Sequence, residues 1–208
     1  MKLAKNDVDL FYKLMMNLFW SVNDKHKINT ELVRKDKDGP PQINAMLTLT
    51  VREPLWNHRE WIEEYLKETG KDTLTEEEYK IVESWGKYTI MDTFFCVKHL
   101  AKYSVLLREE KGQGAKLYGV SGITDSFEDT FSIMPLPFMA TFVLLPFKDR
   151  IIYDGIVKMN PNVVFGPGIS AQLNNTYNKT KAKSGIIERL DTTVDSSSKK
   201  KVKQMPRT

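Results

Sequence analysis

Residues 141–157 read TFVLLPFKDRIIYDGIV, the most informative segment of the chain for its architecture. Two aliphatic runs rich in β-formers flank a three-residue charged break, Lys148-Asp149-Arg150. Alternation of this kind around a short polar break predicts a β-hairpin with a tight turn. The second half of the chain is therefore predicted to consist of antiparallel strands.

The hydrophobic period changes at Tyr88, where the helical spacing gives way to alternation and to continuous apolar runs. The sequence predicts strands over residues 88–97, 103–110, 115–123, 139–146 and 150–157, with a hairpin turn at 111–114. The longer connection 124–137 has room for a short helical turn. Five short strands with sequential turns favour a meander or a small, partly closed barrel of the SH3 or OB type.

Helical patterns occupy the first half of the chain. An amphipathic helix is predicted over residues 6–23. A second follows Pro41 and runs to about Arg52, although a strand fits the same residues. A third is predicted from Pro54 to Glu68, ending at Gly70. A fourth opens at Thr75, which with Glu78 forms a capping box. A last helix is predicted over residues 169–184.

These elements indicate an α+β protein in which a helical N-terminal half packs on a small antiparallel sheet or partly closed barrel, closed off by a C-terminal helix. The predicted organisation is a helical region over residues 1–87 and a β region with its helix over 88–190. A disordered basic tail is predicted over 191–208, because that segment has almost nothing to bury.

The basic net charge of +4 belongs to the end of the chain. Residues 179–208 hold nine basic and three acidic side chains, a net charge of +6, whereas the remaining residues hold 22 basic and 24 acidic, a net charge of −2. Residues 53–83 alone hold ten acids against four bases. A folded part without basic excess argues against a uniformly nucleic-acid-binding domain. The lysines at 199–203 are explained most simply as a solvated tail.

Composition narrows the classes of protein further. A single cysteine, Cys96, excludes an intramolecular disulfide and a multi-cysteine zinc site. The three histidines lack metal-ligand spacing, so neither a metal nor a cofactor is predicted. No apolar run approaches the roughly 20 residues of a membrane span. The N-terminal residues do not resemble a signal peptide, and the sequence therefore predicts a cytoplasmic protein without a membrane partner.

Candidate binding residues gather in the connection between the first two predicted strands. Lys98, His99, Lys102 and Tyr103 place two lysines, a histidine and a tyrosine within six residues. A loop of this composition at the end of a barrel is suited to an anion or a nucleic-acid backbone. The plainer interpretation is an ordinary polar loop.

Tyr153 and Asp154 form a second candidate at the end of the predicted hairpin. A buried carboxylate beside an aromatic ring can act as a general base. More often such an aspartate caps a turn, and Gly155 after it fits that interpretation.

The run LLPFKDRIIYDG at residues 144–155, together with KHL at 98–100 and YGVSGI at 118–123, resembles a segment shared by a group of uncharacterised bacterial proteins. Some members of that group carry a separate zinc-binding SEC-C module. The likeness covers roughly residues 90–190. This chain lacks the cysteines of such a module, so no metal site carries over. The resemblance implies a bacterial cytoplasmic protein and supplies no activity.

The sequence thus favours a non-enzymatic binding or adaptor module whose partner is a protein or a nucleic acid. The competing hypothesis is a small hydrolase-like enzyme that uses Asp154 or His99 in a site between the helical and β halves. Neither hypothesis predicts an oligomeric state.

Overall fold

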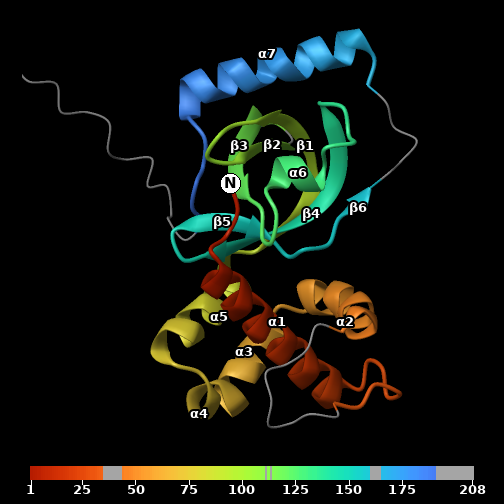
Figure 1. Cartoon of the computed structure of the whole chain (residues 1–208), viewed down its shortest axis with the longest axis vertical. Coiled ribbons are helices and arrows are strands. Elements are labelled where there is room, and N and C mark those ends of the chain that lie inside the picture. Colours follow the sequence, from red (N-terminus) through yellow and green to blue (C-terminus); the bar gives the residue numbers. More distant parts are fainter. Residues whose placement is uncertain (35–43, 111, 113, 160–164, 191–208) are drawn as a thin grey trace, which may run out of the picture.

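The computed structural model describes residues 1–34, 44–110, 112, 114–159 and 165–190. The predicted tail, residues 191–208, lies outside the described residues, as do Lys111 and Gln113 of a predicted turn. The predicted α+β class is confirmed: helices precede a six-stranded mixed sheet, and a helix follows it. The sheet lies between the N-terminal helices and the C-terminal helix (Figure 1).

The N-terminal region contains α1 (Lys5–His26), α2 (Ala45–Asn57), α3 (Glu60–Tyr65), a π-helical turn (Leu66–Gly70), α4 (Lys71–Thr73) and α5 (Glu76–Tyr88). The amphipathic stripe of α1 is buried along its length, from Phe11 to Val22. The alternative of a strand before Arg52 is wrong. The Asn44 side chain caps α2 by accepting a hydrogen bond from the backbone N–H of Leu47 at 3.0 Å.

The predicted helix from Pro54 to Glu68 is wrong at both ends. Pro54 lies inside α2, and the break comes four residues later, at His58-Arg59. The buried residues Leu55 and Trp56 hold the last turn of α2 in place beyond the proline, so packing overrides the helix-starting preference of proline. The chain also stays helical through Gly70, whose φ of −62° is not the left-handed conformation of a glycine stop.

The predicted capping box at α5 is confirmed. The Thr75 hydroxyl accepts a hydrogen bond from the backbone N–H of Glu78 at 3.3 Å, and the Glu78 carboxylate accepts one from the N–H of Thr75 at 2.9 Å. Glu78 also pairs with Lys13 of α1 at 2.6 Å, so this cap connects two helices.

Thr75→Ala is therefore expected to lower the free energy of unfolding by about 1 kcal/mol, the usual effect of losing an N-cap side chain. Chemical denaturation measures the change. Thr75→Ser keeps the capping hydroxyl and is expected to stay within about 0.5 kcal/mol of the original protein. Equal losses in both variants would show that the hydroxyl does not stabilise the helix.

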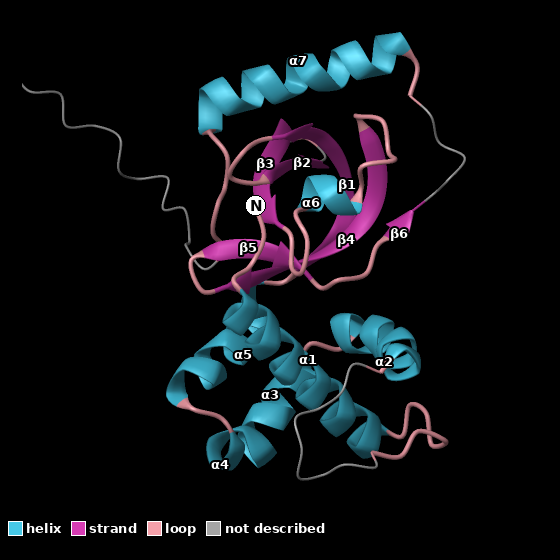
Figure 2. Ribbon diagram, in the orientation of Figure 1, coloured by secondary structure: helices cyan, strands magenta, loops and turns pink. Residues whose placement is uncertain are grey.

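The sheet is formed by β1 (Ile90–His99), β2 (Ser104–Glu110), β3 (Gly114–Ser121), β4 (Phe138–Phe147), β5 (Arg150–Tyr153) and β6 (Lys158–Met159). The strand order is β1-β2-β3-β5-β4-β6, and β1 also pairs with β4, so five of the strands form a ring (Figure 2). A ring leaves fewer unpaired strand edges than an open sheet. Its identification with an SH3 or OB barrel stays a prediction.

The hairpin predicted within residues 141–157 is present, with two corrections. Phe147 pairs with Arg150, so the turn contains two residues, Lys148 and Asp149, rather than three. Lys148 takes a left-handed conformation (φ 53°), as a tight hairpin turn of this length requires. The second strand ends at Tyr153 instead of 157. The N–H of Asp154 still donates to the carbonyl of Val143 at 3.1 Å, while its side chain contacts Arg52 of α2.

One pairing departs from the predicted antiparallel sheet. β3 and β5 are parallel, with Val120 opposite Ile151 and Ser121 opposite Ile152. Between them the chain passes through the short helix α6 (Phe127–Thr130) and β4. A parallel neighbour requires such a crossover, and the sequence pattern of consecutive strands does not reveal one.

Two apolar clusters organise the fold. The larger extends from α1, α2 and α5 to both faces of β4 and β5, so the predicted regions 1–87 and 88–190 share one core. The smaller lies under α7 (Pro167–Ser184), where Leu173 and Tyr177 contact the outer side of the sheet at Val105, Leu107 and Leu117. The helix α7 therefore covers the face of the ring that the N-terminal helices leave open (Figure 1).

Candidate functional site

The predicted binding loop joins β1 to β2 and is short. His99 lies opposite Ser104, and the N–H of Leu100 donates to the carbonyl of Tyr103 at 2.9 Å. Lys102 is exposed at the tip, whereas Tyr103 is half-buried. The loop is therefore a defined hairpin turn with its side chains held at set positions.

The segment after α7 meets this loop. The Tyr103 hydroxyl donates to Glu188 Oε1 at 3.0 Å, and Lys102 Nζ pairs with the other oxygen of the same carboxylate. Burial and the Glu188 contact raise the pKa of Tyr103 to about 12, so the phenol remains a donor at neutral pH. The pKa of Glu188 is lowered, chiefly by the hydrogen bond from Lys102.

Gly119 of β3 allows the Tyr103 ring to approach. A Cβ atom at Gly119 would lie 2.9 Å from the ring carbons, closer than real Cβ contacts. The N–H of Gly119 donates to the carbonyl of Ile187 at 2.9 Å, which places Glu188 beside the loop. The absence of a side chain here thus fixes where the phenol points.

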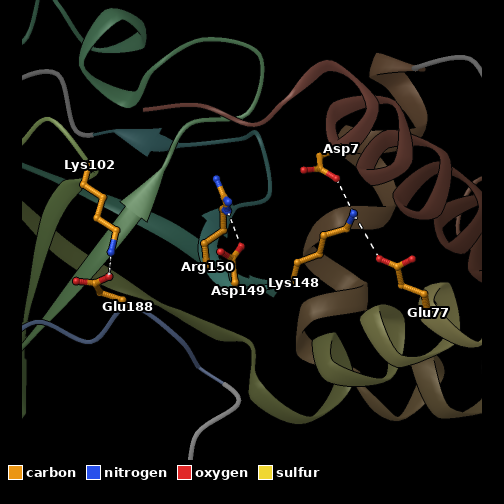
Figure 3. A network of polar contacts seen from close by, with 7 residues as sticks. All are labelled: Asp7, Glu77, Lys102, Lys148, Asp149, Arg150 and Glu188. Atoms are coloured by element: carbon orange, nitrogen blue, oxygen red, sulfur yellow. Dashed lines mark hydrogen bonds and ion pairs between the residues drawn. The ribbon is translucent and has the colours of Figure 1, made fainter.

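A cavity of about 70 Å³ opens between this loop and the β4–β5 turn. Side chains from the loop, from the hairpin and from the C-terminal segment line it together with β3: Lys102, Tyr103, Ser121, Asp149, Arg150 and Glu188. Arg150 Nε donates to Asp149 Oδ1 at 3.0 Å, and this pair and the Lys102–Glu188 pair stand on either side (Figure 3). Two cations and two hydroxyls therefore meet around one small space.

Lys98 belongs to a neighbouring surface. Its ammonium group lies 5.6 Å from the centroid of the Tyr177 ring, and Lys181 of α7 lies 5.7 Å from the same centroid. One tyrosine ring thus contacts two lysines from distant parts of the sequence. Cation–π contacts of exposed lysines stabilise by about 0.5–1 kcal/mol, enough to bias the position of both side chains.

His99 faces the interior side of the loop. Its Nδ1 lies 2.6 Å from the Ser104 hydroxyl, and its ring is 6.5 Å from that of Phe127. Burial lowers the pKa of His99, because the charged imidazolium is disfavoured away from water. His99 is not among the residues that line the cavity.

Asp154 lies in a different place, where the sheet contacts α2. Its side chain is 1% exposed and accepts from Arg52 Nε at 2.5 Å, from Arg52 Nη2 at 3.1 Å, and from Trp56 Nε1 at 3.0 Å. The N–H of Ile156 adds a fourth donor at 3.2 Å. Burial raises the pKa of the Asp154 carboxyl, and the guanidinium of Arg52 opposes the rise. The geometry is that of a structural ion pair between helix and sheet.

Tyr153 packs in a cluster of aromatic rings formed with Phe127, Phe131 and Phe142. Burial raises its pKa to about 12. The six candidate residues are thus divided between the loop surface and the helix–sheet contact, and neither Tyr153 nor Asp154 lines the cavity.

The tip of the hairpin contacts the N-terminal helices. Lys148 Nζ lies 2.6 Å from Asp7 of α1 and 3.4 Å from Glu77 of α5 (Figure 3). The turn that the sequence predicts is therefore also a joint between the hairpin and two helices.

No arrangement for metal chemistry occurs in the described ranges, where no group of three or more His, Cys, Asp or Glu is placed to hold an ion. Cys96 is buried, and burial raises its pKa, which makes the thiol unreactive. None of the helices in the described part of the chain is long and apolar enough to cross a membrane.

Comparisons with family models, with curated proteins and with solved structures find no match for this chain. The resemblance to bacterial proteins that carry a SEC-C module accordingly stays a prediction. Any functional assignment depends on the geometry of the loop surface.

Five residues that contact the loop or lie beside it were not identified from the sequence. Asp149, Arg150 and Glu188 line the cavity, and Tyr177 and Lys181 lie beside Lys98. Asp149 and Arg150 belong to the charged break that the sequence analysis noted, but nothing in the sequence indicates that they lie beside the 98–103 loop. For Lys181 the sequence did contain an indication, because the 18 residues of α7 include three lysines and no carboxylate.

Proposed function

We propose that the protein is a non-enzymatic binding module whose partner is a nucleic acid, contacted through its phosphate backbone. The observation that carries the proposal is the convergence of Lys98 and Lys181 on the Tyr177 ring. Two lysines that contact one ring concentrate positive charge on this part of the surface, and lysine ammonium groups are the usual partners of backbone phosphates.

The composition of α7 supports the same surface. Amides and lysines are prominent among its exposed residues, including Asn174, Asn178, Lys179 and Lys183. Asparagine, glutamine and lysine side chains are the donors that proteins commonly direct at phosphate and sugar oxygens. The ten acids of residues 53–83 lie in the helices at the other end of the molecule (Figure 1), which orients a polyanion toward α7.

The alternative of a hydrolase-like enzyme between the two halves has no observation in its favour. The carboxylate of Asp154, the proposed base, accepts hydrogen bonds from Arg52 and Trp56. His99 is half-buried and bonded to Ser104. A cytoplasmic location and a bacterial origin stay predictions of the sequence.

Binding of short labelled RNA and duplex DNA, measured by fluorescence anisotropy over a range of salt concentrations, tests the proposal. The double variant Lys98→Ala/Lys181→Ala is expected to weaken binding and to reduce the slope of log K against log [salt] by about 2, about one unit for each lost phosphate contact. A slope that stays unchanged in this variant would contradict the assigned surface.

The matched control is Lys67→Ala/Lys80→Ala. Both of its lysines are exposed partners of glutamates in the acidic helices, and the change in net charge is the same. The control is expected to keep the original salt slope. If both double variants lost the same affinity, the effect would arise from net charge and not from this surface.

A further inference from the structure

The cavity beside the 98–103 loop brings together donors that the proposed nucleic-acid surface does not use. Lys102 comes from the loop, Arg150 from the β4–β5 hairpin and the Tyr103 hydroxyl from the start of β2, with Ser121 of β3 in the same lining. In the described structure two carboxylates, Glu188 and Asp149, accept from these donors. Each acceptor is thus an anion bound at the edge of a polar cavity.

We propose that this cavity binds a single tetrahedral oxyanion of the phosphate type, which takes the places of the Glu188 and Asp149 carboxylates. A phosphate offers several oxygens to one lysine, one arginine and one phenol simultaneously. Charge-assisted hydrogen bonds of this kind are about twice as strong as neutral ones.

A bound anion can displace the two carboxylates from their donors. The side chain of Glu188 is 40% exposed and that of Asp149 is 69% exposed, so each can turn into water. Surface ion pairs contribute only about 0–1 kcal/mol, and the exchange therefore costs little. The contact with Asp149 uses Nε alone, whereas an arginine side chain offers five N–H donors in a fork that matches phosphate oxygens.

Two of the donors, Arg150 and Tyr103, are held more firmly than Lys102, whose side chain is 66% exposed. The Arg150 side chain is 26% exposed and begins β5 opposite Phe147. The Tyr103 ring lies flat against Gly119, which fixes the direction of its hydroxyl. Preorganised donors lose little conformational entropy when a ligand binds, which favours a defined site over a diffuse attraction.

Titration of the full chain with inorganic phosphate at constant ionic strength and pH, followed by amide NMR, tests the proposal. Saturable shifts are expected for the amides of Gly119, Ser121 and Arg150. Arg150→Ala is expected to weaken binding about tenfold, as expected for loss of a charge-assisted contact. Glu188→Gln is expected to strengthen it severalfold, because the competing charge is removed.

Tyr103→Phe separates a defined site from general attraction to positive charge. It leaves every charge and the packing on Gly119 in place and removes one donor, and it is expected to weaken phosphate binding severalfold. Lys80→Ala, which removes a lysine far from the cavity in sequence, is expected to have no effect. Absence of saturable shifts, or equal affinities of the original protein and of Tyr103→Phe, would overturn the proposal.

The same chemistry is present in a free phosphate and in the terminal phosphate of a nucleic acid. Oligonucleotides with and without a terminal phosphate distinguish the two sources. An advantage of the phosphorylated strand that disappears in Arg150→Ala identifies the terminus as the ligand, and inorganic phosphate binding without such an advantage identifies a small oxyanion. The Lys98/Lys181 variant leaves this cavity intact, so failure of the backbone surface and failure of the cavity give separate results.

Discussion

Asp154→Ala is expected to lower the free energy of unfolding by about 3–5 kcal/mol, because it leaves the largely buried guanidinium of Arg52 without its carboxylate partner. The guanidinium then keeps the carbonyl of Ile156, 3.2 Å from Nη2, as an acceptor. The Arg52 side chain is 12% exposed, and its two contacts with the carboxylate measure 2.5 and 3.1 Å. Trp56 Nε1 loses its acceptor in the same variant. Urea denaturation followed by circular dichroism measures the change.

Two further variants test the reason for that loss. Arg52→Met/Asp154→Leu removes both charges and is expected to be less destabilised than Asp154→Ala alone, since replacing a buried pair with apolar groups is often close to neutral. Asp9→Ala breaks an exposed pair with Lys5 on α1 and is expected to cost about 1 kcal/mol or less. A loss in Asp154→Ala no larger than that of Asp9→Ala would contradict a structural role for Asp154.

Trp85→Ala is expected to lower the free energy of unfolding by about 3–5 kcal/mol, the range for removal of a large buried aromatic side chain. Trp85 is fully buried, lies 6.0 Å from Phe11 between ring centroids, and donates from Nε1 to the carbonyl of Pro146 at 2.9 Å. It therefore contacts α1 from α5 and also holds the hairpin strand β4. Thermal and chemical denaturation both measure the effect.

Trp85→Phe distinguishes packing from hydrogen bonding at this position. It keeps an aromatic ring but leaves the buried Pro146 carbonyl without its donor, and it is expected to cost about 1–3 kcal/mol. A loss as large as that of the alanine variant would assign the stabilisation to the hydrogen bond rather than to the volume of the ring.

The α+β class, the capping box and the hairpin were predictable because each depends on local chemistry. Alternation around Lys148-Asp149 defines two strands and a turn wherever they lie, and Thr75 with Glu78 needs only three residues of spacing. The continuation of α2 through Pro54 was not predictable, because it depends on the burial of Leu55 and Trp56 against distant elements. The parallel pairing of β3 with β5 escaped prediction for a similar reason.

At the candidate site, too, local features could be predicted and long-range contacts could not. The loop composition made Lys102 and Tyr103 candidates, but their partner Glu188 lies 85 or more residues away. Asp154 was more simply explained as a turn residue accepting backbone hydrogen bonds, and the N–H of Ile156 does donate to it. Its ion pair with Arg52 spans 102 positions, and no pattern in the sequence connects the two.

The sequence alone was enough to predict a hairpin within residues 141–157, helices before it and an excess of basic charge toward the C-terminus. Periodicity, capping and composition depend on a few neighbouring residues, so they can be recognised in the sequence. Only the tertiary structure decided that Lys148 joins the hairpin to α1 and α5, that Lys98 and Lys181 share Tyr177, and that Arg150 faces the loop of Tyr103. These contacts result from the packing of the helices on the sheet and from the pairing of distant strands, which bring together side chains that are far apart in the sequence.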